Sequence, residues 1–256
     1  MKGWSRGQIE KHREAAKLLG KVKDEGIAYI GEKRGVTEWE VQQFLVRRFR
    51  HYGLKTDGQP PIVGFNGSAA TPHYFPKRVS RKLTLDSLIL IDIWARLNES
   101  DAPFADMTWM AYHGKKISPN VMRVFETVIR SRDVCLRFVR SKLEAGEMPR
   151  GEEADRISKE VIIRGGYGKH ILHSTGHSLG FTSPHGVPPY LNQKNGGRLL
   201  RNVGYTIEPG VYLKDKFGVR SEIDFFIDRN MKLVVTTDVQ KKIDRVDCVS
   251  QRVRVK

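Results

Sequence analysis

Apolar residues recur at helical spacing in the first quarter of the chain. Residues 6–28 place aliphatic side chains three or four positions apart, which predicts an amphipathic helix with Ser5 as its N-cap. Thr37-Glu-Trp-Glu40 has the pattern of a capping box and predicts a second helix, which Gly53 closes. Neither helix carries a candidate catalytic residue, so we interpret both as scaffold.

The next segment is an apolar run that contains a single aspartate. Ser87-Leu-Ile-Leu-Ile-Asp92-Ile-Trp-Ala predicts a β-strand covered on both faces. Asp106 lies in the next apolar segment, and the turn-like residues 98–103 predict a hairpin that brings the two acids together. A buried carboxylate is costly unless it is paired, hydrogen-bonded or bound to a metal. From the residues alone, two unrelated strand-end aspartates remain an equal alternative.

The second half of the chain begins with two further helices and then changes pattern. Ser118-Pro119 predicts the N-cap and first position of a long helix that runs to Gly146, and another helix is expected over about 152–164. Short strands are expected from residue 169 onward, the last over 233–236. Cys135, inside the long helix, is interpreted as an inert packed thiol.

Imidazoles and carboxylates concentrate in these later segments. Pro209 keeps Glu208 out of the helical region, on extended backbone. Arg220, Glu222 and Asp224 alternate, so we expect them to share one face of one strand.

Composition narrows the class of protein. With 256 residues, the chain can form one substantial core, and its 39% hydrophobic and 29% charged residues are ordinary for a water-soluble domain. No apolar run reaches membrane-spanning length, and the first residues lack the apolar core of a signal peptide. Two cysteines make no disulfide framework, which fits a reducing compartment. We therefore expect a cytoplasmic protein without a membrane partner.

The formal net charge of +16 raises the question of nucleic-acid binding. Lys and Arg are spread over the predicted helices, and no RNA-binding motif with interleaved aromatic residues stands out. We interpret the charge as a basic solvated surface and do not expect a nucleic-acid partner, although the charge leaves one open. A modest basic cluster occupies the end of the chain, so we divide the chain into a domain of residues 1–240 and a basic tail of residues 241–256.

The order of the acidic and imidazole residues resembles a known family. Asp92 and Asp106 are followed by His177 in Gly-His-Ser-Leu-Gly, by Glu208 in Ile-Glu-Pro-Gly and by Glu222 in Val-Arg-Ser-Glu. This arrangement resembles the pita-bread metallopeptidases, which include methionine aminopeptidases, Xaa-Pro aminopeptidases and dipeptidases, and creatinases. The resemblance runs from about residue 11 to residue 236. It implies a single-domain α+β fold in which helices cover a curved antiparallel sheet.

The resemblance also implies a dinuclear metal site. Its ligands would be Asp92, Asp106, His177, Glu208 and Glu222. Four carboxylates and a neutral imidazole carry a charge of −4, which two divalent ions cancel. Oxygen-rich ligation with one nitrogen suits manganese, cobalt, iron or zinc, among which we favour manganese. A hydroxide bridging the two ions would attack the first peptide carbonyl of the substrate.

Further residues acquire roles by the same resemblance. Glu208 would double as the proton shuttle, His185 would stabilise the tetrahedral intermediate, and His73 would contact the substrate near the scissile amide. His173 and Arg220 resemble substrate-binding residues of the Xaa-Pro branch. The implied activity is hydrolysis of the N-terminal bond of a peptide, with Xaa-Pro specificity favoured.

Two alternatives stay open. The chain has no room for the additional N-terminal domain that Xaa-Pro enzymes normally carry, and its length is closer to that of a methionine aminopeptidase. Some pita-bread proteins have lost their metals and serve as binding modules for RNA or protein. All five ligand positions are kept here, which argues against a non-catalytic module. Dimers are common among relatives, so a homodimer is an open expectation.

Overall fold

The antiparallel strands β3 (Ser87–Leu97) and β4 (Ala105–His113) form the central hairpin of the computed structural model, which describes residues 3–246. Strands β1 (Leu54–Lys55) and β2 (Ile62–Phe65) pair with different parts of β3, and β10 (Asp244–Arg245) adds a parallel strand beside β4. The first nine residues of β3 are buried. The prediction of a strand covered on both faces is therefore confirmed.

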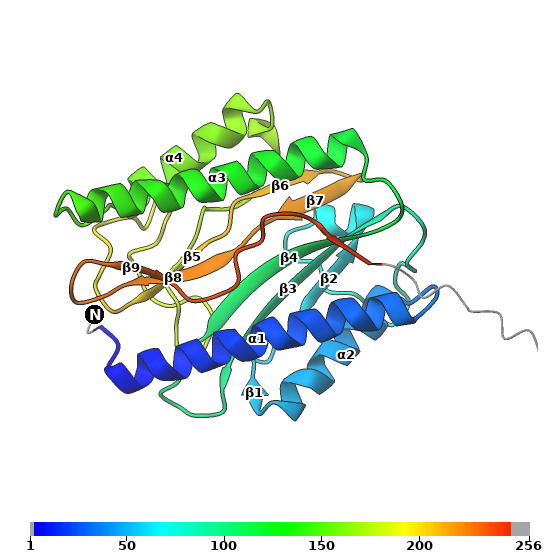
Figure 1. The fold of residues 1–256 in the computed structure, drawn as a ribbon, viewed down its shortest axis with the longest axis horizontal. Coiled ribbons are helices and arrows are strands. Elements are labelled where there is room, and N and C mark those ends of the chain that lie inside the picture. Colours follow the sequence, from blue (N-terminus) through cyan, green and yellow to red (C-terminus); the bar gives the residue numbers. More distant parts are fainter. Residues whose placement is uncertain (1–2, 247–256) are drawn as a thin grey trace, which may run out of the picture.

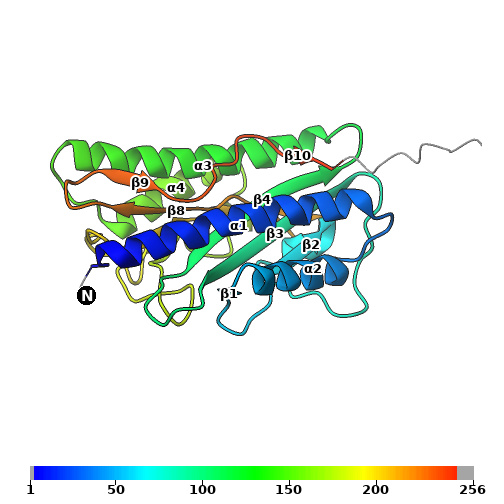
Figure 2. The same cartoon turned by 60° about the horizontal axis from the view of Figure 1, so that its bottom comes forward.

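Helices α1 (Arg6–Glu32) and α2 (Glu38–His51) lie together along one face of this hairpin, as Figures 1 and 2 show. Ser5 caps α1 and Thr37 forms the capping box of α2, both as predicted, and the structure shows that Ser5 forms a capping box as well. The aliphatic side chains at alternate positions of β3 pack against these two helices. Gly26 allows α1 to approach α2 closely, because a Cβ atom there would lie 2.7 Å from the side chain of Leu45.

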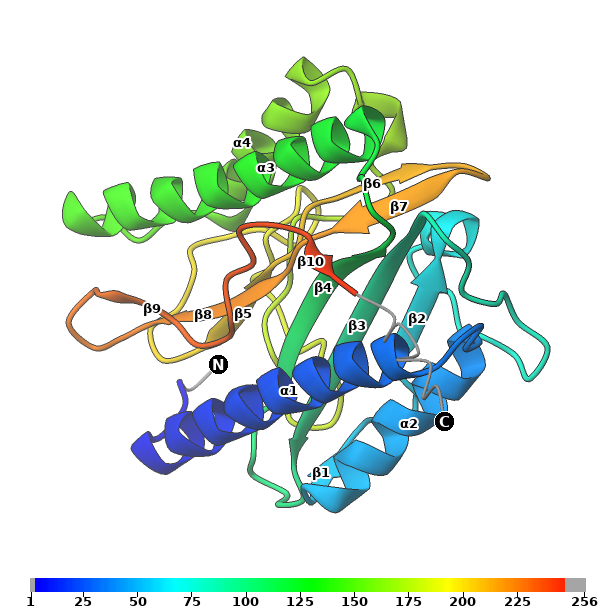
Figure 3. The ribbon, with the colours of Figure 1, turned by 45° about the vertical axis from the view of Figure 1, so that its right-hand side comes forward.

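Helices α3 (Pro119–Glu144) and α4 (Gly151–Arg164) form the opposite layer, and Ser118 caps α3 as predicted. They cover two smaller groups of strands. One is the sheet of β5 (Gly204–Ile207), β8 (Ile223–Ile227) and β9 (Leu233–Val235), and the other is the hairpin of β6 (Gly210–Leu213) and β7 (Phe217–Arg220). Figure 3 shows the strands enclosed between the two helical layers. The expectation of an α+β fold with a curved, mainly antiparallel sheet is confirmed.

The structure corrects two expectations about the second half of the chain. Arg220 ends β7, Glu222 lies between strands, and Asp224 belongs to β8, so the three residues do not share one strand. The alternating pattern was misleading because the chain crosses here from one sheet to the other. The short strands expected from residue 169 begin only with β5, and residues 171–203 form an irregular segment with isolated β-bridges. A single turn of 3-10 helix, η2 (Gly168–His170), precedes them, and another, η1 (Asn66–Ala70), follows β2.

The end of the described chain packs on the central hairpin. Residues Ile243 and Val246 are buried beside β10. The remaining residues, 247–256, lie outside the described part, so the division into a domain of residues 1–240 and a tail of residues 241–256 stays a prediction. Between residues 3 and 246, no helix combines the length and the apolar character needed to cross a membrane.

Candidate metal centre

Eight of the nine predicted site residues line one cavity of about 170 Å³. The cavity lies where the central hairpin meets the two smaller groups of strands. The eight residues are His73, Asp92, Asp106, His177, His185, Glu208, Arg220 and Glu222. Residues that are far apart in the sequence thus converge on one small space.

The hairpin of β3 and β4 places the two aspartates. In its register, Asp92 lies opposite Thr108 and Asp106 lies opposite Trp94, so the two acids occupy diagonal positions on the same face. Both are almost fully buried. The predicted hairpin is therefore confirmed, and the alternative of two unrelated aspartates is wrong.

The two glutamates enter from breaks between strands. Glu208 lies between β5 and β6 and is followed by Pro209, while Glu222 lies between β7 and β8. Thr206 connects two of the converging segments, since its hydroxyl accepts from the N–H of His177 at 3.0 Å and donates to Glu208 Oε1 at 3.2 Å. Breaks in regular pairing thus direct both carboxylates into the cavity.

His177 presents a ring nitrogen to the acidic side chains. Its Nδ1 lies 3.0 Å from the carbonyl oxygen of Ser178, which can only accept, so Nδ1 carries a proton. Its Nε2 lies 3.2 Å from Glu208 Oε1 and 3.9 Å from Asp106 Oδ2. In the neutral ring a lone pair faces carboxylate oxygens, and a cation held by His177 and these carboxylates would make the contacts attractive.

The buried carboxylates repel one another, and a bound cation would relieve this repulsion. Burial, followed by the charges of Glu222 and Asp92, raises the pKa of Asp106 well above its ordinary value. Burial, followed by the charges of Glu208 and Asp92, does the same to the pKa of Glu222. In the described part of the chain, the buried Oδ1 atoms of Asp92 and Asp106 have no hydrogen-bond partner. Ligand atoms of Asp106, His177 and Glu222 lie within 4.8 Å of one another, so these three residues form a candidate metal site.

Arg220 is the buried counter-charge of this cluster. Its Nη2 donates to Asp92 Oδ2, and its Nε donates to the hydroxyl of Thr108 at 2.9 Å. Thr108 in turn donates to Glu222 Oε2 at 2.7 Å. Arg220 and Thr108 therefore hold two of the predicted ligands in fixed orientations. The substrate-binding role predicted for Arg220 stays a prediction, because its guanidinium is directed at Asp92.

The three other predicted histidines occupy different positions. The ring of His185 lies against that of His177, with centroids 4.0 Å apart, and His73 is exposed at the cavity wall. His173 does not line the cavity. It contacts the hydroxyl of Tyr212 at 2.7 Å, and its Nδ1 lies 4.0 Å from Glu208 Oε2. Its burial lowers its pKa below the ordinary value.

Asp224 lies behind the cavity. Its Oδ2 accepts from the backbone N–H of Asp106 at 2.8 Å, which ties β8 to β4. It does not line the cavity. Its burial raises its pKa well above the ordinary value.

The sequence did not single out several residues that line the cavity: Asp57, Gln59, Ile62, Phe75, Trp94 and Pro184. Trp94 had a usable signal, because it lies two positions after Asp92 on the same predicted strand and therefore on the same face. Asp57 had none, since it lies in a loop. Its place at the cavity depends on the hydrogen bond that it accepts from Trp94 Nε1 at 2.9 Å.

Known proteins are similar to this chain in sequence. The sequence model of a family described as metallopeptidase family M24 matches residues 10–229. An uncharacterized peptidase of Staphylococcus haemolyticus is 29% identical over 229 residues, which are 90% of this chain and 61% of that protein. An uncharacterized peptidase of Staphylococcus aureus is 27% identical over 232 residues, or 62% of its length. The chain thus spans about three fifths of the length of these relatives.

Solved structures are similar over almost the whole chain. The crystal structure of an X-Pro aminopeptidase from Thermotoga maritima has a TM-score of 0.82 and 26% identity, and the match covers 95% of this chain and 64% of that one. A recombinant prolidase from Thermococcus sibiricus also has a TM-score of 0.82, with 27% identity over 94% of this chain and 61% of its own. The expected pita-bread fold is confirmed.

Proposed function

The chain belongs to metallopeptidase family M24, and from this premise we propose that it is a metal-dependent aminopeptidase that hydrolyses the N-terminal bond of peptides. We propose further that it prefers substrates with proline in the second position and uses two divalent ions, with manganese favoured. The observation that carries the proposal is the convergence of four acidic residues and one imidazole on one cavity. Such a buried excess of negative charge suits divalent cations.

The metal ions would be held by Asp92, Asp106, His177, Glu208 and Glu222. When bound, they would supply Lewis acidity for the scissile carbonyl and lower the pKa of a water molecule. The chain's own residues orient these groups. Thr206 and the backbone of Ser178 position Glu208 and His177, respectively.

Proton movement in this proposal belongs to Glu208. Its Oε1 faces His177 and its Oε2 faces His173, so the carboxylate lies between two imidazoles at the cavity wall. A carboxylate in this position can take a proton from water and deliver it to the departing amine. His185 and His73 line the same cavity and would contact the substrate on either side of the scissile bond.

The preference for Xaa-Pro substrates has two supports. The solved structures with more than 25% identity include an X-Pro aminopeptidase and a prolidase, and the similarity in each case covers nearly all of this chain. In addition, His173 and Arg220, which resemble residues of the Xaa-Pro branch, both contact the hydroxyl of Tyr212 beside the cavity.

A peptide panel tests the proposal. Metal-stripped protein is resupplied with manganese or cobalt and incubated with Xaa-Pro peptides, Met-Ala peptides and neutral controls. Release of the residue before proline is expected. Glu208→Gln should abolish turnover, while Glu144→Gln, an exposed change of the same kind on α3, should leave it intact.

Other outcomes point elsewhere. Release of methionine alone would favour the methionine aminopeptidase alternative. Retained activity in Glu208→Gln would remove the role assigned to that residue. Metal binding without hydrolysis of any peptide would favour a non-catalytic binding module.

A further inference from the structure

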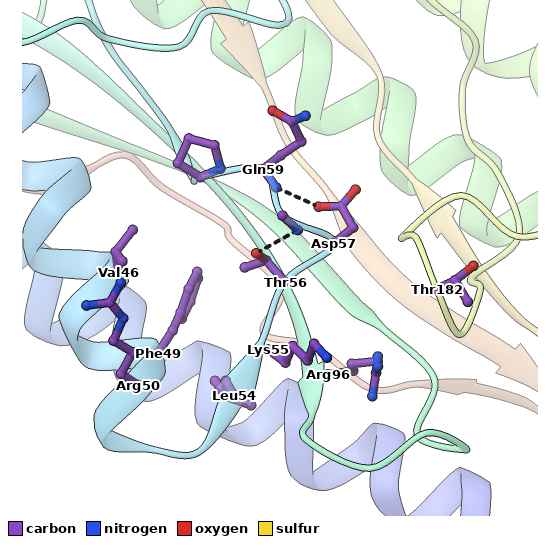
Figure 4. Close-up of a pocket in the computed structure, with 12 residues that line it drawn as sticks. Val46, Phe49, Arg50, Leu54, Lys55, Thr56, Asp57, Gln59, Arg96 and Thr182 are labelled. Carbon is purple, nitrogen blue, oxygen red and sulfur yellow. Dashed lines mark hydrogen bonds between the residues drawn. The ribbon is translucent and has the colours of Figure 1, made fainter.

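A second cavity, of about 650 Å³, lies directly beside the metal cavity. Asp57 and Gln59 line both, so the two spaces adjoin at the loop that follows β1. Figure 4 shows this second cavity between α2, the strands β1 and β3, and the loop that carries Thr182. A peptide whose amino terminus lies at the metal site can therefore continue into it.

Basic side chains outnumber acidic ones in the wall of the second cavity. Arg50, Lys55 and Arg96 line it, whereas Asp57 is its one acidic lining residue. The Oδ1 of Asp57 is already engaged by Trp94 Nε1 and by the N–H of Gln59. Within residues 3–246, no carboxylate lies within ion-pair distance of Arg50 or Lys55. The cavity therefore carries positive charge that the described chain does not neutralise.

The strand register concentrates this charge. Lys55 of β1 and Arg96 of β3 are direct partners in the antiparallel pair, so their side chains project from the same face. Figure 4 shows both side chains at this wall of the cavity. Like charges directly opposite each other destabilise a strand pair. An anion bound between them would remove this repulsion.

Arg96 is held in place by its own contacts. Its Nη1 donates to the carbonyl oxygens of Leu97 and Glu99, and its guanidinium lies over the ring of Phe104. These contacts fix the direction of a planar donor that suits carboxylate groups. The apolar side chains of Phe49 and Leu54 line the cavity as well and offer contact area to the aliphatic part of a ligand.

The distance from the metal site is set by β3. Asp92, Trp94 and Arg96 alternate along this strand and therefore lie on one face. Four residues of strand separate Asp92 from Arg96, which corresponds to roughly 13 Å at about 3.3 Å per residue. An extended peptide advances by a similar amount per residue, so its third to fifth residues would reach Lys55 and Arg96.

We propose that this basic cavity binds a carboxylate of the peptide substrate, about four residues from its amino terminus. The carboxylate is either the C-terminus of a tetrapeptide or an acidic side chain of a longer peptide. This inference rests on the proposed function, which places the amino terminus at the metal centre. The preferred substrates are then short peptides or longer peptides with an acidic side chain at this position.

Two matched pairs of peptides test it. Ala-Pro-Ala-Ala is compared with its C-terminal amide, and the amide of Ala-Pro-Ala-Glu is compared with that of Ala-Pro-Ala-Gln. The first pair reports on a C-terminal carboxylate and the second on an acidic side chain. For each peptide, kcat/KM is measured with the manganese-loaded protein, and binding is measured by calorimetry with metal-free protein.

The carboxylate member of at least one pair is expected to be favoured about fivefold, the size of a good exposed ion pair. The ratio should shrink at about 0.5 M salt, because salt screens exposed charges. Lys55→Glu should reduce the ratio to about one or below, since it replaces the cation with a repelling charge. Lys17→Glu, an equal charge change on the exposed side of α1, should leave the ratio unchanged.

Equal values within both pairs, or a ratio that survives Lys55→Glu, would overturn the proposal. Lys55→Glu faces Arg96 across the strand pair, so loss of folding is not expected, and thermal unfolding checks this. Absence of hydrolysis of every peptide would contradict the proposed function instead. In that case the binding ratios from calorimetry decide the present proposal by the same criteria.

Discussion

The guanidinium of Arg220 donates to the carboxylate of Asp92, although 128 positions separate the two residues in the sequence. The same guanidinium donates a hydrogen bond to the hydroxyl of Thr108, and this hydroxyl donates one to the carboxylate of Glu222. Two predicted metal ligands from distant segments of the chain are thus connected through one arginine and one threonine. The first two predictions test this connection.

Replacement of Arg220 by methionine should destabilise the metal-free protein by about 3–5 kcal/mol, because it leaves the buried Asp92 without its partner. Urea unfolding at neutral pH measures the loss. The double variant Asp92→Asn/Arg220→Met should recover most of it, since position 92 then carries no charge that needs the guanidinium. A double variant as unstable as Arg220→Met alone would contradict this explanation.

Thr108→Val should weaken metal binding about tenfold, the lower range for residues that hold metal ligands through hydrogen bonds. The change keeps the shape of the side chain but removes the hydroxyl that orients Glu222. Competition with a metal chelator measures the dissociation constant. Thr127→Val, which removes a hydroxyl from α3 away from the cavity, is the control and should bind metal normally.

Asp106→Asn should raise the melting temperature of the metal-free protein by about 2–4 °C, which corresponds to roughly 1 kcal/mol in a domain of this size. The reason is that one of several buried, mutually repelling carboxylates is removed. The same variant should lose the stabilisation that manganese gives to the unchanged protein. Differential scanning calorimetry, with and without metal, follows both effects.

Asp215→Asn provides the matched control for Asp106→Asn. Asp215 is exposed in the turn between β6 and β7 and has positive φ, a conformation that asparagine also accepts. The Asp215→Asn variant should have the same melting temperature as the unchanged protein, both with and without metal. A lower melting temperature for metal-free Asp106→Asn would show that repulsion does not dominate at this position.

The stability of the protein should fall as the pH drops from about 6.5 to about 4 because of His12. Burial lowers the pKa of this histidine to about 4, and its Nδ1 contacts the carbonyl oxygen of Phe104. The pKa of His12 is about 4 in the folded chain and 6.5 in the unfolded chain. Between these two values the unfolded chain binds a proton that the folded chain does not. Stability therefore rises with pH across this window and is lost as the pH falls. The contribution is roughly 3 kcal/mol in total.

Urea unfolding of the unchanged protein and of His12→Gln over this pH range isolates the effect. The difference in unfolding free energy between the two proteins should shrink by most of that amount as the pH falls to about 4. His51→Gln, at an exposed position of α2, serves as the control and should follow the unchanged protein. A pH-independent difference for His12→Gln would contradict the assignment.

Several elements of the fold could be predicted because their signals are local. Ser5, Thr37 and Ser118 cap helices through hydrogen bonds to backbone groups within three residues, so a short stretch of sequence contains the whole interaction. The continuous apolar run around Asp92 likewise indicated a strand covered on both faces. The spacing and context of the acidic and imidazole residues then sufficed to recognise the family.

Long-range packing decided the rest. Alternation placed Arg220, Glu222 and Asp224 on one strand, but the chain crosses there from the pairing of β7 with β6 to the pairing of β8 with β5. The opposition of Lys55 and Arg96 depends on the register between β1 and β3, which their separate sequences do not contain. By itself the sequence determined which residues are candidate metal ligands, where the capped helices begin and where the central strands lie. The tertiary structure decided which charges meet, because strand register and burial arise from contacts between segments that are distant in the chain.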